Sequence, residues 1–143
     1  MTADRAAARA ALVAVPARLA AAAGNAANRP VAEGEWSPVD VVRHLIAVET
    51  EVWHARLDRL ATENDPHWPW TEPDRWLDRP DATLEELLAV HAARRAETVA
   101  RLDSLDDAGW RRTGTHATYG VLDVHTMLRI LLDHDEEHIA GLR

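Results

Sequence analysis

The sequence lacks cysteine and phenylalanine altogether and has only six glycines among its 143 residues. Without cysteine there can be no disulfide, no thiolate nucleophile and no sulfur ligand for zinc. This composition fits a reducing compartment, so we expect the protein to lie in the cytoplasm. No run of 18 or more apolar residues occurs, and we therefore expect no membrane span. The apolar residues near the N-terminus keep helical spacing, which favours an amphipathic helix over a targeting sequence.

Basic residues are outnumbered: 16 stand against 24 acidic ones, which gives a formal net charge of −8. Such a balance disfavours binding to phosphate groups, and no basic cluster is interleaved with aromatic residues. We therefore expect no nucleic-acid partner and no membrane partner. A small-molecule substrate is the partner that the composition leaves open.

Alanine, leucine, arginine and glutamate dominate the chain, and all are good helix formers. No convincing run of alternating β-branched residues occurs, so the sequence predicts an all-α protein, with residues 1–143 forming a single domain. Ser37, Pro38 and Asp40 mark one helix start, and Thr83 with Glu86 marks another. Pro16 should kink or restart the first helix. Amphipathic helices are predicted over residues 3–23, 38–61, 84–102 and from 121 onward, which together indicate a four-helix bundle.

Residues 62–82 differ from the rest because they hold four prolines together with Trp68, Trp70 and Trp76. The prolines exclude a regular helix, and three indoles are more than a floppy linker would carry. We predict an ordered crossover loop that lies against the bundle. Its indoles either cap the core or line the mouth of a pocket, and the sequence leaves both alternatives open.

His134-Asp135-Glu136-Glu137-His138 places two histidines four residues apart, on one face of the last predicted helix. Both fall where a bundle helix would normally carry leucine, and a buried imidazole needs a partner. A divalent metal is one candidate partner. The alternative is that the two histidines are hydrogen-bonded within the protein or lie on the surface. Asp135 stands where zincin proteases have glutamate, which disfavours that class. No histidine or carboxylate side chain follows His138, so a third ligand should come from earlier in the chain.

His44 is the histidine that also falls on the inward stripe of a predicted helix. Three neutral imidazoles from His44, His134 and His138, with an open fourth position, form a catalytic-type site for zinc and also suit nickel or iron(II). A di-iron site is excluded by its ligand count, because it needs paired Glu-x-x-His motifs. The remaining histidines are interpreted as surface or structural residues: His54, His67, His91, His116 and His125.

Two motifs carry a resemblance to a known family. The segment Trp36-Ser37-Pro38-Val39-Asp40-Val41-Val42-Arg43-His44-Leu45, followed about ninety residues later by His134-Asp135-Glu136-Glu137-His138, resembles the DinB-like superfamily. That group includes YfiT-like hydrolases and the mycothiol-dependent maleylpyruvate isomerase type. The resemblance implies an up-up-down-down four-helix bundle and a metal site whose ligands are His44, His134 and His138. Members often carry a glutamine three residues after the last histidine, where this chain has Gly141.

The leading hypothesis is a metal-dependent enzyme, either a hydrolase or a transferase that uses a low-molecular-weight thiol, as the family suggests. Asp135 and Glu51 are the candidate catalytic carboxylates, with Asp135 favoured as a residue that orients a ligand histidine. The alternative is a stress-associated binding protein with a structural or vestigial metal and no turnover. A cleft that reaches the metal would favour the enzyme. A leftover apolar face on the first or fourth helix would favour a homodimer.

Overall fold

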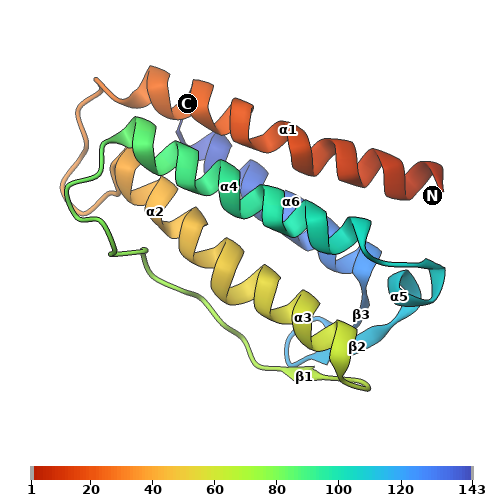
Figure 1. The fold of residues 1–143 in the computed structure, drawn as a ribbon. Helices are drawn as coiled ribbons and strands as arrows, with labels where there is room; N and C mark the ends of the chain where they lie inside the picture. Colours follow the sequence, from red (N-terminus) through yellow and green to blue (C-terminus); the bar gives the residue numbers. More distant parts are fainter. Residues whose placement is uncertain (1, 143) are drawn as a thin grey trace.

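The computed structural model describes residues 2–142, and four long helical stretches of these residues form a bundle with a small sheet at one end (Figure 1). The predicted capping arrangement at Ser37 is confirmed: its hydroxyl accepts the N–H of Asp40, whose carboxylate accepts the N–H of Ser37. Thr83 likewise accepts the N–H of Glu86. The elements are α1 (Ala3–Ala26), α2 (Pro38–Val48), η1 (Glu49–His54), α3 (Ala55–Thr62), β1 (His67–Trp68), α4 (Leu84–Asp103), α5 (Asp107–Arg111), β2 (Thr113–His116), β3 (Gly120–Asp123) and α6 (Val124–Gly141).

The predicted four-helix bundle is confirmed, and its helix directions follow from long-range contacts. Arg9 binds Asp103 at the end of α4, so α1 and α4 are antiparallel, whereas Arg18 pairs with Glu136 and α1 runs beside α6 in the same direction. The helix formed by α2, η1 and α3 runs parallel to α4 (Figure 1). The four long helices therefore run up, down, down and up in chain order, whereas the resemblance implies the order up, up, down, down. The reason is that a single connection, residues 63–83, returns along the whole bundle.

Pro16 does not interrupt α1, contrary to the predicted kink or restart. A proline inside a helix leaves the carbonyl four residues earlier without its usual donor. Here that carbonyl belongs to Leu12, and it accepts a hydrogen bond of 3.0 Å from Nη1 of Arg95 on α4. Leu12, Val15 and Leu19 are fully buried on either side of the proline, so packing holds the helix together.

The second long helix extends to Thr62, close to its predicted end, but Glu49–His54 form a π-helical segment inside it. The wider turn adds a residue and rotates α3 about the helix axis relative to α2. Glu49 begins this segment and points into the core, on the same side as Val42 and Ile46, where it is 1% exposed, whereas Glu51 lies on the surface. A regular helix would have returned Glu51 to the side of His44, seven residues earlier, so the departure at Glu51 could not be predicted from the helical period.

The crossover loop is ordered, as predicted, and its tryptophans divide between the two suggested roles. Trp68 is buried in the core and Trp76 packs against a second apolar cluster, whereas Trp70 is 54% exposed. Arg43 holds the loop to α2 by donating hydrogen bonds to the carbonyl oxygens of three loop residues, Trp76, Asp78 and Arg79.

A three-stranded sheet corrects the expectation that the connections hold no strands. β1 pairs in parallel with β2, and β2 pairs antiparallel with β3. The strands have two to four residues, too short to show an alternating pattern in the sequence. Gly114 of β2 lies directly under the indole of Trp68, and a Cβ at this position would overlap the ring. The sheet thus fixes the start of the crossover loop.

The absence of a run of 18 apolar residues led us to expect no membrane span. By length and hydropathy, however, α1 qualifies as a candidate span. One such helix near the N-terminus is weak evidence, because the core helix of a soluble protein and a signal sequence both pass the same test. Four of its residues, Leu12, Val15, Leu19 and Ala23, are completely buried against the other helices.

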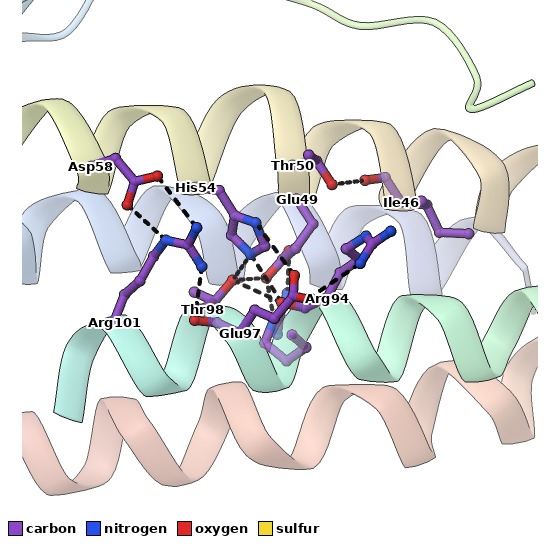
Figure 2. Close-up of polar contacts among 10 residues, drawn as sticks. Ile46, Glu49, Thr50, His54, Asp58, Arg94, Glu97, Thr98 and Arg101 are labelled. Atoms are coloured by element: carbon purple, nitrogen blue, oxygen red, sulfur yellow. Dashed lines mark hydrogen bonds and ion pairs between the residues drawn. The ribbon is translucent and has the colours of Figure 1, made fainter. Parts of the chain in front are cut away.

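A buried polar network joins the helices. The guanidinium of Arg95 pairs with Glu49 at 2.7 Å and with Asp135 of α6 at 2.7 Å, and all three side chains are almost fully buried. Thr98 donates its hydroxyl to Glu49 and lies 2.8 Å from Nε2 of His54, as Figure 2 shows. Burial raises the cost of leaving any of these groups unpaired.

We expect Arg95→Met to lower the free energy of unfolding by roughly 3–5 kcal/mol, because it leaves two buried carboxylates without a cation. Arg9→Met is the matched control. Arg9 pairs with Asp103 in a bridge whose side chains are 40% and 42% exposed, so we expect a far smaller loss than for Arg95→Met. Urea denaturation followed by circular dichroism measures both, and equal losses would contradict the proposed role of Arg95.

Candidate metal centre

Three histidines meet between α2 and the last turns of α6. His44 lies two turns after the start of α2, and His134 and His138 lie one turn apart on α6, which runs antiparallel to α2. One nitrogen of each ring lies within 4.8 Å of the corresponding atoms of the other two. The ring centroid of His44 lies 5.5 Å from that of His134 and 4.9 Å from that of His138. The structure therefore brings together the three predicted ligand residues.

The crossover loop sets the protonation of His44. Its Nδ1 lies 3.0 Å from the carbonyl oxygen of Asp74, and a carbonyl only accepts, so the proton is on Nδ1. In this tautomer the lone pair of the ring is on Nε2. This is how proteins commonly orient a histidine that ligates a metal.

His134 and His138 crowd each other. Their Nε2 atoms lie 3.2 Å apart, and Nδ1 of His134 is buried with no hydrogen-bond partner among the described residues. Burial, and then the neighbouring histidines, lower the pKa of His138 to about 4, and the same causes lower the pKa of His134. Both rings are therefore neutral at pH 7 and offer lone pairs. A close set of neutral imidazoles fits a divalent metal ion of the zinc type.

A cavity of about 810 Å³ reaches the three histidines. The crossover loop forms one wall with Trp70 and Glu72, so it borders the cavity without filling it. Trp53, Arg56 and Tyr119 belong to the same lining, and Asp133 and Glu137 contribute carboxylates from α6. The arrangement combines candidate ligands, aromatic walls and ionisable groups in one space, as small-molecule sites do.

The two predicted catalytic carboxylates lie elsewhere. Asp135 points into the core toward Arg95 and does not line the cavity, and burial raises its pKa to about 6 against the opposing effect of Arg95. Glu51 is exposed on the outer face, because the π-helical segment turns it away from the side that carries His44. The structure brings neither of them to the histidines.

Sequence reasoning missed Glu49, Arg95 and Arg56. Arg95 could have been suspected from α4, where a stripe of polar residues (His91, Arg95 and Thr98) falls at core spacing between Leu87 and Leu102. Arg56 gave no signal, because the π-helical segment shifts the face on which it lies.

The other five histidines fall into two groups. His67 is exposed and His125 is partly buried, whereas His54, His91 and His116 are buried. His54 donates from Nε2 to the backbone of Arg94. Neither ring nitrogen of His91 has a hydrogen-bond partner among residues 2–142.

Comparison with known proteins identifies the family. The sequence model of the DinB superfamily matches residues 5–141, so the chain belongs to the DinB superfamily and the predicted resemblance is confirmed. The solved structure of YfiT from Bacillus subtilis, described as a probable metal-dependent hydrolase with an unusual four-helix bundle topology, has the same fold. The two are 23% identical with a TM-score of 0.76, over 99% of this chain and 86% of that one. A search of curated proteins gave no match.

We expect His91→Leu to make the protein less sensitive to acid. Burial lowers the pKa of His91 to about 4, with Glu49 opposing and Arg95 reinforcing the shift, whereas the unfolded chain titrates near 6.5. The unfolded state therefore binds more protons between these values, and stability falls as pH falls through this window.

The free energy of unfolding is measured in urea at pH 7 and at pH 5. Between these pH values the parent should lose roughly 2 kcal/mol more than His91→Leu loses. His67→Ala, at an exposed position, should leave the pH dependence of the parent unchanged. If the free energy of unfolding of His91→Leu falls by the same amount as that of the parent between pH 7 and pH 5, the prediction is wrong.

Proposed function

We propose that the protein is a metal-dependent enzyme in which His44, His134 and His138 hold one divalent ion. We expect zinc first, with nickel and iron(II) as alternatives. The observation that supports the proposal is the cavity: three imidazoles border a space large enough for a small molecule. A purely structural metal would need a closed set of ligands, which these three residues do not supply.

When bound, such an ion supplies Lewis acidity, which activates a nucleophile or polarises the bond to be broken. The side chains around it hold and orient the reactants. Asp74 keeps His44 in the tautomer that leaves Nε2 free, and the bond from Arg95 to Asp135 fixes the helical turn that carries His134. We therefore assign Asp135 a positioning role.

Proton transfer falls to carboxylates that line the cavity. Glu137 follows His134 by three residues on α6, and Glu72 faces it from the crossover loop. Both can take a proton from a water or thiol nucleophile and deliver it to a leaving group. Glu51, on the opposite face of its helix, has no part in this proposal.

The reaction class is hydrolysis of a small molecule or transfer of a low-molecular-weight thiol to one. The family relationship and the mostly apolar cavity support both reaction classes. The two classes differ in the nucleophile, which is water in hydrolysis and the thiol in the transfer. The non-catalytic alternative loses support because the crossover loop leaves the histidines accessible from the cavity.

We expect the purified, untagged protein to contain about one equivalent of divalent metal by elemental analysis. The double variant His134→Ala, His138→Ala should lose it, whereas His67→Ala, which removes an exposed histidine, should retain it. Chelation should lower the melting temperature of the parent and leave that of the double variant unchanged, because a ligand that binds only the folded state stabilises it.

Activity is then tested on a panel of esters and amides and by conjugation of a small thiol to electrophiles. We expect turnover that disappears on chelation and returns with metal. Absence of metal from the parent after incubation with zinc, nickel and iron(II) would overturn the metal site. Metal without turnover across both panels would favour the binding protein.

A further inference from the structure

Arg56 is a buried cation without a carboxylate partner in the part of the chain that the structure describes. It lies on α3, is 6% exposed and lines the same cavity as the three histidines. Its guanidinium carbon lies 5.3 Å from the ring centroid of Trp53, over the face of the indole. None of the ion pairs formed among residues 2–142 involves it, although guanidinium groups stay charged and usually take a carboxylate when buried.

The one polar contact of Arg56 among the described residues is with His116, and the tautomer of that histidine decides its nature. Nδ1 of His116 accepts the backbone N–H groups of Thr118 at 2.9 Å and of Tyr119 at 3.2 Å. A backbone N–H can only donate, so Nδ1 carries no proton and the ring proton is on Nε2. Nε2 lies 3.2 Å from Nη2 of Arg56, which also only donates.

Two donors therefore face each other with no acceptor between them. Such a pair is costly when buried, and the guanidinium, which borders the cavity, gains an acceptor when an anion binds there. Arg56 can bind both oxygens of a carboxylate through its planar fork. The cavity is already lined by four acidic residues, Glu72, Asp74, Asp133 and Glu137, which favours a singly charged ligand over a phosphate dianion.

We propose that Arg56, backed by the buried His116, forms an oxyanion-binding subsite, and that the small molecule bound in this cavity carries a carboxylate on an apolar body. Trp53, Trp70 and Tyr119 supply the apolar walls beside Arg56. The rings of Trp70 and Tyr119 lie 6.1 Å apart, and Tyr119 also packs on His116 at 4.8 Å. This assigns a substrate class and rests on the function proposed above, but the binding step does not depend on the metal.

The test uses metal-free protein, because a carboxylate can also bind a metal ion. Benzoate, its neutral amide benzamide and inorganic phosphate are titrated by calorimetry and by tryptophan fluorescence. We expect benzoate to bind more tightly than either of the others. Arg56→Met should weaken benzoate binding roughly 10- to 100-fold, the usual effect of losing a charge-assisted hydrogen-bonded pair, and leave benzamide unaffected.

Arg75→Met is the matched control. Arg75 also lies over an indole, that of Trp36 at 5.4 Å, but it pairs with Asp40 and does not line the cavity. This variant should bind benzoate like the parent. Arg56→Lys keeps the charge without the fork and should bind with intermediate affinity, which guards against a folding defect in Arg56→Met.

Nitrogen NMR of histidine-labelled protein tests the tautomer directly, and we expect His116 to be protonated at Nε2. A proton on Nδ1, equal benzoate affinity of the parent and Arg56→Met, or tighter binding of phosphate than of benzoate would each overturn the proposal. The outcomes are separable from those of the metal analysis. Benzoate binding without any metal would leave the subsite intact, and metal without benzoate binding would leave the metal centre intact.

Discussion

The guanidinium of Arg95 is the constraint on which the bundle depends. It stays charged in the middle of the core and takes acceptors from every other long helix: the Leu12 carbonyl of α1, Glu49 of the second helix and Asp135 of α6. Each acceptor fixes the position of its helix along the bundle axis. Pro16 contributes by freeing the Leu12 carbonyl, so a residue that normally breaks helices here provides a contact between two of them.

The same network positions the functional side of the molecule. Asp135 lies in the turn between His134 and His138, so its bond to Arg95 turns those histidines away from the core axis and toward the cavity. The π-helical segment acts similarly on the second helix, because His44 and Arg56, which lie on either side of it, both reach the cavity. Buried charge and local helix geometry together define the site.

Local signals explain what the sequence could predict. The caps at Ser37 and Thr83 and the spacing of His134 and His138 depend on neighbours within four residues, so the helices and the cluster of histidines could be anticipated. The direction of the helices, the two- to four-residue strands and the continuity of α1 through Pro16 depend on partners far along the chain. The role of Arg56 depends on a helix irregularity and on a tautomer, neither of which has a local pattern.

Polar groups are buried in this protein in two different ways. Around Arg95 the donors and acceptors match, and the result is a closed network with no room for a ligand. At the histidine cluster and at Arg56 they do not match, and both places border the same cavity. An unmatched group alone does not define a site, because the ring nitrogens of His91 have no partner among residues 2–142 and this residue lines no part of that cavity. It is the coincidence of unmatched groups with accessible space that distinguishes the regions built to receive a ligand from those that only hold the helices together.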